Sequence, residues 1–239
     1  MTVMGRMFVR GDTHGNFDFL PYFCQEHNTT TDDVLVILGD AGILYYGAKK
    51  PREKYLKQHL AEQPITLFCV RGNHEDRPEK RGMTCAYNSL VDGEVYSEDV
   101  CPNVLYAKDG AVYHWNGKSI LTIGGAYSID KFYRCAMGWY WNPAEQLTES
   151  EMDAITQQHM GKYYDYVFTH TCPFTWQPTD LFLSGIDQNS VDNSMEIWME
   201  GFSRDIDFGH WYFGHFHADR LDVCGDGKVT MLFNGDLEL

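Results

Sequence analysis

The clearest fold signal in the chain is Val34-Leu35-Val36-Ile37-Leu38-Gly39-Asp40, in which five apolar residues run directly into Gly-Asp. A run this short, rich in β-branched residues and closed by glycine, is typical of a buried strand that ends in a turn. The same arrangement occurs at 7–9 before Gly11-Asp12 and at 65–70 before Gly72-Asn73. The repetition predicts three buried strands, each followed by a polar turn.

Two segments with helical spacing separate these three strands. Residues 16–27 repeat apolar side chains at that spacing, with Pro21 in the expected first turn, and residues 51–63 do the same after an initial proline. The order strand, helix, strand, helix, strand predicts parallel strands with right-handed crossovers. Helices then cover the sheet, as in α/β folds.

The next part of the chain is expected to be antiparallel. Three short extended runs are separated by Asp109-Gly110 and Asn116-Gly117, which are strong hairpin signals. A helix is expected at 148–160, where Thr148 and Glu151 have capping-box spacing. The whole pattern predicts an α/β sandwich. The extended runs are 104–107, 111–115 and 119–123; further strands are expected at 164–168 and 211–213, and a closing hairpin is expected between Val223 and 229–233.

Composition indicates one folded domain that spans residues 1–239. Hydrophobic residues make up 44% of the 239 positions, which is enough to bury a sizeable core, and no linker or repeat interrupts the chain. The formal charge of −15, from 34 acidic and 19 basic residues, disfavours long nucleic acids as partners. Bound divalent cations would add local positive charge that this count omits.

The seven cysteines form no C-x-x-C pair, which argues against a disulfide framework and against a thiolate zinc site. No stretch approaches the roughly 18 to 20 apolar residues of a membrane span, and the N-terminus has no long apolar segment. We therefore expect a cytoplasmic protein with no membrane partner. The cysteines are Cys24, Cys69, Cys85, Cys101, Cys135, Cys172 and Cys224.

Polar turns follow five of the predicted strands. Because ligands gather at the carboxyl ends of strands in open α/β sheets, these turns are expected to converge. Their carboxylates, imidazoles and carboxamide are ligands for a divalent metal. His215 and His217 would point to the same side if they lay in a strand. The turns are Gly11-Asp12-Thr13-His14-Gly15, Gly39-Asp40, Gly72-Asn73-His74-Glu75, Thr169-His170 and Gly214-His215-Phe216-His217.

This ordered set resembles the calcineurin-like metallophosphoesterase superfamily, whose pattern is GDxH, GDxx(D), GNH(D/E), a later histidine and GHxH. The match runs from Asp12 to His217. The resemblance implies a β-sandwich of mixed sheets flanked by helices and a site for two divalent or trivalent metal ions, with Mn, Fe or Zn favoured over Mg alone. It implies one metal held by Asp12, His14 and His217, another held by Asn73, His170 and His215, and Asp40 as the bridge between them.

The resemblance further implies hydrolysis of a phosphomonoester or phosphodiester by a metal-bridging hydroxide, with His74 as general acid or electrostatic stabiliser. The substrate is then a small phosphoester or a phosphoprotein. The alternatives are a Ser/Thr-type protein phosphatase, a nucleotide or cyclic-nucleotide phosphodiesterase, a nuclease, and a non-catalytic interaction module like the retromer subunit of similar fold.

The second motif departs from the protein-phosphatase pattern. Gly42, Ile43 and Leu44 stand where that branch continues to an aspartate and an arginine. The expected carboxylate partner of His74 is therefore missing, and Glu75 or Asp76 could orient the imidazole instead. The phosphate-clamping arginine is missing too.

Two later segments could contribute to substrate binding. Tyr127, Lys131 and Arg134 lie in a glycine-rich polar segment after a predicted strand, and they are the candidates for the phosphate clamp. The aromatic cluster 139–141 could line a pocket or pack as core. Cys172 follows His170 by two residues and is expected to be a packing residue rather than a nucleophile.

Overall fold

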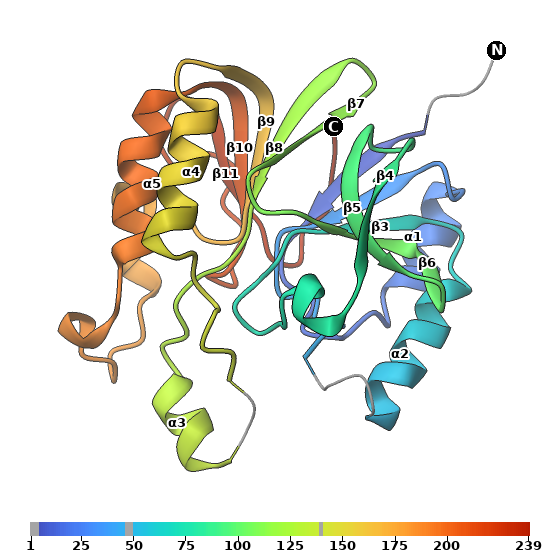
Figure 1. Ribbon diagram of the computed structural model, residues 1–239, viewed down its shortest axis with the longest axis horizontal. Coiled ribbons are helices and arrows are strands. Elements are labelled where there is room, and N and C mark those ends of the chain that lie inside the picture. Colours follow the sequence, from blue (N-terminus) through green and yellow to red (C-terminus); the bar gives the residue numbers. More distant parts are fainter. Residues whose placement is uncertain (1–4, 46–49, 139–140) are drawn as a thin grey trace.

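Two β-sheets pack against each other, and helices cover their outer faces (Figure 1). The computed structural model describes residues 5–45, 50–138 and 141–239. Within these residues the first sheet has the order β12-β1-β2-β3-β6-β5-β4 and the second has the order β11-β10-β9-β8-β7. The first sheet comprises β1 Met7–Arg10, β2 Val34–Ile37, β3 Thr66–Cys69, β4 Thr84–Asn88, β5 Gly93–Glu98, β6 Cys101–Ala107 and β12 Leu237–Glu238; the second comprises β7 Ala111–Trp115, β8 Lys118–Ile123, β9 Tyr163–Thr169, β10 Asp207–Phe213 and β11 Val229–Met231.

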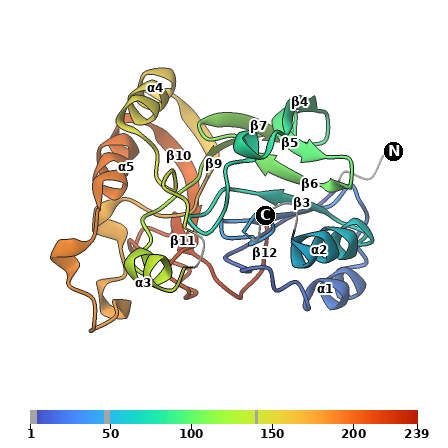
Figure 2. The same cartoon turned by 60° about the horizontal axis from the view of Figure 1, so that its bottom comes forward.

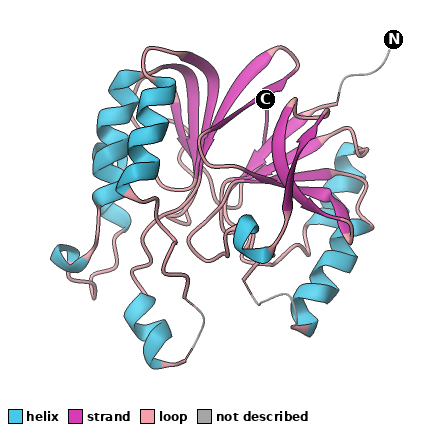
Figure 3. Cartoon of the chain, viewed as in Figure 1, coloured by secondary structure: helices cyan, strands magenta, loops and turns pink. Residues whose placement is uncertain are grey.

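The helices lie on opposite sides of this sandwich (Figures 2 and 3). On one side they pack on the first sheet, on the other side they pack on the second, and one short helix lies apart from both sheets. The helices are α1 Leu20–His27 and α2 Pro51–Ala61 beside the first sheet, α4 Glu149–His159 and α5 Ser194–Asp205 beside the second, and α3 Lys131–Ala136 apart; 3-10 turns occupy Pro78–Arg81, Phe174–Trp176, Thr179–Leu181 and Gln188–Ser190.

The predicted parallel core is confirmed. β2 pairs in parallel with β1 and β3, and β3 pairs in parallel with β6. Alternate side chains of each strand point to opposite faces of the sheet. Leu35 therefore packs toward α1 and α2, whereas Val36 packs into the core between the two sheets. Both are fully buried, which explains why the strand reads as an uninterrupted apolar run.

The antiparallel section expected at 104–123 is confirmed at only one of its two hairpins, and β8 has an antiparallel neighbour only in β7. β7 and β8 form the predicted hairpin around Asn116 and Gly117, whose φ angles are 50° and 77°. Strands β8, β9, β10 and β11 are instead parallel to one another. Asp109-Gly110 forms no hairpin, because it carries the chain from β6 in one sheet to β7 in the other. The Asp109 carboxylate accepts hydrogen bonds from Arg71 at 2.9 Å and Gly124 at 2.7 Å.

The predicted helix and strand boundaries are confirmed in part. Thr148 and Glu151 form the predicted capping box at the start of α4. The first helix begins only at Leu20, because the turn before it is bound to the loop after β2: His14 N–H donates to Asp40 O at 2.8 Å. The expected closing hairpin is present as a short antiparallel contact. Val223 N–H donates to the Val229 carbonyl at 2.9 Å, and Arg220 and Met231 exchange backbone hydrogen bonds at 2.8 and 2.9 Å, while β11 itself pairs in parallel with β10.

The structure also bears on the expectations for the cysteines and for membrane-spanning helices. All seven cysteines are free thiols, and Cys172 is fully buried in the core beneath α4 and α5. Burial raises the pKa of the Cys172 thiol well above its usual range, in line with a packing role. No helix among the described residues has the length and apolarity that crossing a bilayer requires.

Candidate metal site

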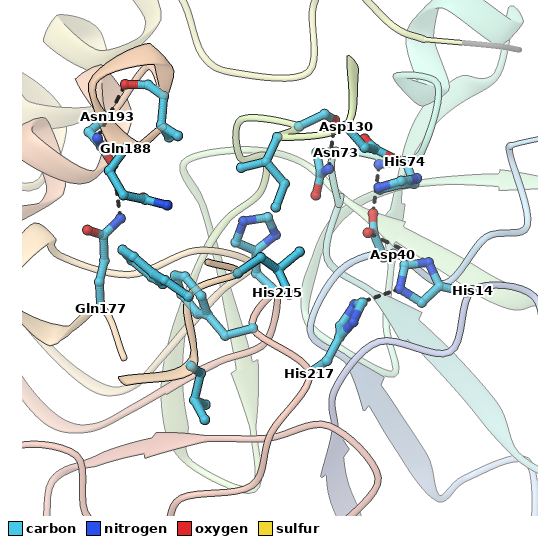
Figure 4. A pocket seen from close by; sticks show the side chains of 17 residues that line it. His14, Asp40, Asn73, His74, Asp130, Gln177, Gln188, Asn193, His215 and His217 are labelled. Carbon is cyan, nitrogen blue, oxygen red and sulfur yellow. Dashed lines mark hydrogen bonds and ion pairs between the residues drawn. The ribbon is translucent and has the colours of Figure 1, made fainter. Parts of the chain in front are cut away.

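The turns after β1, β2, β3, β9 and β10 meet at one edge of the sandwich, where both sheets end. Side chains from the turns after β1, β2, β3 and β10 line one end of a cavity of about 450 Å³ (Figure 4). Among the residues that the structure describes, three groups of carboxylate and imidazole atoms lie close enough to hold a metal ion. They are Asp12 with His14 and His217, Asp12 with Asp40 and His170, and Asp40 with His14 and His74.

Two buried carboxylates form the centre of this cluster. Asp12 Oδ1 accepts from His215 N–H at 2.9 Å, and Asp40 Oδ1 accepts from His74 N–H at 2.8 Å. The second oxygen of each carboxylate points at imidazoles: Asp12 Oδ2 lies 3.3 Å from His217 Nε2, and Asp40 Oδ2 lies 3.7 Å from His170 Nε2. Asp12 Oδ2 has no hydrogen-bond partner in the described structure. A buried anionic oxygen without a donor suits a bound cation.

The imidazoles are spaced as neighbouring ligands of one ion would be. His14 Nε2 and His217 Nε2 lie 2.9 Å apart. Two ligand nitrogens bound at about 2.1 Å and at right angles to each other would be separated by roughly 3 Å. The His217 ring is also stacked on Phe233 with a centroid distance of 4.8 Å, which fixes its plane. His215 is in none of the three groups, but its ring packs against His170 at 4.9 Å.

Asn73 and His170 present lone pairs to each other at the same place. The Leu38 carbonyl lies 2.8 Å from His170 Nδ1 and can only accept, so it selects the Nδ1–H tautomer and leaves a lone pair on Nε2. Asn73 Oδ1 lies 2.7 Å from that nitrogen. Two acceptors at this distance repel unless a cation lies beside both. Together with the buried carboxylates, this donor set fits a metal centre.

A buried relay sets the orientation of the Asn73 amide. Asn73 Nδ2 donates to Ser128 Oγ at 2.8 Å, and that hydroxyl donates to Glu145 Oε2 at 2.5 Å. Glu145 also accepts from Ser128 N–H at 3.0 Å and from Trp141 Nε1 at 2.7 Å. The carboxylate accepts from the hydroxyl, so the hydroxyl accepts from Asn73, and Oδ1 is left to face His170. Sequence reasoning missed Ser128 and Glu145, which carry no motif.

Unusual backbone conformation is concentrated in these turns. Seven described non-glycine residues have positive φ, and four of them are the predicted ligands His14, Asp40, His215 and His217, with φ of 48°, 47°, 69° and 52°. Such strain clusters at functional sites. The expectation that His215 and His217 share a strand face is wrong, because β10 ends at Phe213 and both residues lie in the following turn.

Two glycines are required by close approach. Gly39 has a φ of +91°, and a Cβ there would strike the His170 imidazole. A Cβ at Gly72 would strike the Asp40 carboxylate. Each of these two glycines thus makes room for a predicted ligand that belongs to a different motif.

Electrostatics in the cluster favour a cation. Burial and the nearby Asp12 carboxylate raise the pKa of Asp40 well above its usual range, because two negative charges are held in a water-poor site. Burial, together with the Arg134 guanidinium, lowers the pKa of His74 to about 3. The His74 imidazole is therefore neutral near pH 7 in the structure as described.

His74 reaches the cluster from the side of the cavity. Its ring packs edge-on against His14 with centroids 5.4 Å apart, and the Tyr45 ring lies 6.2 Å away. Glu75 does not take the role of its carboxylate partner, because Glu75 accepts backbone N–H groups of Gly42 at 2.8 Å and Gly72 at 3.2 Å. Asp76 accepts from Arg81 at 2.7 Å.

The three candidates for a phosphate clamp lie near the site, but none lines the cavity among the described residues. Arg134 on α3 is 2% exposed, 3.7 Å from Asp130 and 5.4 Å from the Tyr45 ring centroid. The Lys131 ammonium lies 4.4 Å from the Tyr127 ring centroid, and Tyr127 donates from its hydroxyl to a backbone carbonyl at 3.4 Å. Residues 139–140 of the predicted aromatic cluster lie outside the described residues.

Comparison with protein families agrees with this geometry. The family model for calcineurin-like phosphoesterases matches residues 6–219. One solved crystal structure, 13% identical, covers 98% of this chain and 94% of its own with a TM-score of 0.50. A protein of unknown function from Aquifex aeolicus, also 13% identical, covers 70% of this chain and 80% of its own with a TM-score of 0.32. No curated protein matches significantly. Members of the matched family are usually metal-dependent phosphoesterases with a binuclear centre, and the chain belongs to the calcineurin-like phosphoesterase family.

Proposed function

We propose that this protein hydrolyses phosphomonoesters or phosphodiesters at a centre of two metal ions. Asp12, His14 and His217 would hold one ion, and Asp40 would lie between the two. The other ion would be held by Asn73, His170 and His215. The observation that carries the proposal is the pair of buried carboxylates, each with one oxygen fixed by a backbone N–H and the other aimed at imidazoles.

Two such ions bind phosphate oxygens and lower the pKa of the attacking water. The chain itself would orient that reaction. The fixed carboxylate oxygens and the single tautomer of His170 hold the ligands in place before substrate arrives. Five of the seven proposed ligands line the cavity, so the phosphoester would enter from that side; they are His14, Asp40, Asn73, His215 and His217.

His74 is the proposed donor to the leaving-group oxygen. It lies beside the cluster on the cavity wall, and its backbone N–H is fixed by Asp40, which places the ring next to the site. A neutral imidazole still offers one N–H to a developing alkoxide. A bound phosphate would also oppose the positive Arg134 charge, which together with burial lowers the pKa of the imidazole.

The test compares His74→Ala on two phosphate monoesters that differ in leaving group. With phenyl phosphate we expect kcat to fall by about 10²- to 10⁴-fold, the usual loss for an acid–base group. With 4-nitrophenyl phosphate the loss is expected to be much smaller, because nitrophenolate leaves without a proton. Metal content should stay unchanged.

His114→Ala is the matched control, because the His114 side chain is 54% exposed on β7, away from the cavity. Equal losses on both esters would contradict the role of His74. Absence of turnover of both esters and of bis(4-nitrophenyl) phosphate by the metal-loaded wild type would contradict the proposed function. A protein that binds metal without turning over any ester would be an interaction module instead.

A further inference from the structure

The cavity above the cluster has two unlike walls (Figure 4). One wall carries five of the seven predicted ligands together with His74. The opposite wall is formed by the segment 177–193, which lies between β9 and α5, together with Phe216 from the turn after β10. Any phosphoester bound at the cluster would extend toward this second wall, so its side chains decide which leaving group fits.

Apolar side chains dominate the second wall. Leu181 and Leu183 are 42% and 63% exposed although they line the cavity, and Ile129 nearby is 41% exposed. The Phe182 and Phe216 rings are stacked, with centroids 6.3 Å apart and planes 19° apart. Apolar side chains grouped and exposed around a cavity usually mark a binding site, since a free surface seldom gathers them.

The polar groups on this wall are neutral. They are three carboxamides, of which Gln177 donates to Asn193 at 3.1 Å and Gln188 donates to a backbone carbonyl at 3.3 Å. No lysine or arginine is among the described residues that line the cavity. The acidic groups that line it are Asp40, in the cluster, and Asp130. A leaving group with its own carboxylate or phosphate would find no cation here and would be repelled by Asp130.

We propose that this wall is the leaving-group subsite and that it takes an uncharged, largely apolar group of aromatic size. The proposal rests on the proposed function and narrows it. Phosphate esters of neutral aryl alcohols, including those with amide groups that the carboxamides can meet, are then favoured over acidic phosphopeptides and over esters that carry a second phosphate.

The test uses four aryl groups: phenyl, 2-naphthyl, 4-carbamoylphenyl and 4-carboxyphenyl. Each is offered to the metal-loaded protein as the phosphate ester, for kcat/KM, and as the non-hydrolysable phosphonate, for Kd by calorimetry. The carbamoyl and carboxyl groups have the same shape and differ in charge. We expect 2-naphthyl to exceed phenyl, and carbamoyl to exceed carboxyl, by roughly tenfold or more in both measurements.

Leu181→Ser with Leu183→Ser should reduce the naphthyl-to-phenyl ratio toward one. Leu221→Ser is the matched control, because Leu221 is also 63% exposed but does not line the cavity. Phosphonates that bind without preference, or best when carboxylated, would overturn the subsite while turnover of phenyl phosphate leaves the proposed function standing. Failure to turn over any of the four esters would overturn the proposed function and the subsite together.

Discussion

The relay from Asn73 through Ser128 to Glu145 makes a prediction about metal binding. In Glu145→Gln, one carboxylate oxygen becomes an NH₂ group. With the amide in one orientation, NH₂ faces Ser128 N–H, which in the wild type donates to Oε1 at 3.0 Å, and this repulsion pushes Ser128 away from its position in the relay. In the other orientation, NH₂ faces both Trp141 Nε1 and the Ser128 hydroxyl, which in the wild type donate to Oε2 at 2.7 and 2.5 Å. Either orientation sets a donor against a donor.

The magnitude follows from that mismatch. An unpaired buried donor costs about 1–3 kcal/mol, and loss of a group that orients a metal ligand typically lowers metal affinity about 10–100-fold. We therefore expect the affinity for one of the two metal ions to fall by about 10–100-fold. The other ion should bind as in the wild type, because Asn73 is the proposed ligand that the relay orients. Calorimetric titration of Mn²⁺ or Zn²⁺ into metal-free protein measures both events.

Two comparisons make this result specific. Glu149→Gln changes an exposed glutamate in the first turn of α4 and should leave both affinities at the wild-type values. Ser128→Ala breaks the same relay, so the double variant with Glu145→Gln should lose little more than Ser128→Ala alone. If both relay variants fold and bind two metals with wild-type affinity, the reasoning about Asn73 is refuted.

Three further predictions follow from the structure. Gly72→Ala should abolish tight metal binding, measured by metal analysis, because the new Cβ collides with Asp40; wild-type metal content would contradict this. Burial raises the pKa of Glu196 to about 7. The protonated carboxyl is therefore favoured in the folded state, so the contribution of Glu196 is fully present below about pH 4.5 and is lost as pH rises to 7, by roughly 3 kcal/mol. Glu196→Gln should raise Tm relative to wild type more at pH 8 than at pH 5; the Thr171 hydroxyl, which donates at 2.8 Å, retains an acceptor. Finally, chelation should lower Tm, because a metal bound only by the folded state stabilises it and the buried Asp12 and Asp40 carboxyls lose that cation; an unchanged melting curve would count against a metal in the cluster.

Local patterns predicted the part of the fold that holds the first three turns. Strands β1, β2 and β3 are buried on both faces, and strands of this kind have continuous apolar stretches in their sequence. The hairpin predicted at Asn116-Gly117 is confirmed because the two residues of such a turn determine its conformation locally. The hairpin predicted at Asp109-Gly110 is wrong because a turn signal does not determine which sheet the next strand joins. Long-range packing determines that.

The candidate site was predictable to the level of residue type and order, but not of geometry. The ligand turns follow strands, and strand ends can be read from the sequence. Ser128 lies 55 residues from Asn73, and nothing in either segment indicates that their side chains meet. The orientation of the His215 and His217 side chains depends on a positive φ at both residues, and a polar turn in the sequence does not indicate such a φ. The apolar wall at 177–193 has no regular periodicity, so it too required the structure.

The most direct test of the central claim is a metal titration of phosphoesterase activity. Metal-free protein should show no turnover of 4-nitrophenyl phosphate, and activity should rise with added Mn²⁺ or Zn²⁺ to a plateau at two equivalents per chain. Asp40→Asn should not reach that plateau at any metal concentration tested. Full activity in the presence of excess chelator, or full activity in the metal-loaded Asp40→Asn variant, would contradict the account.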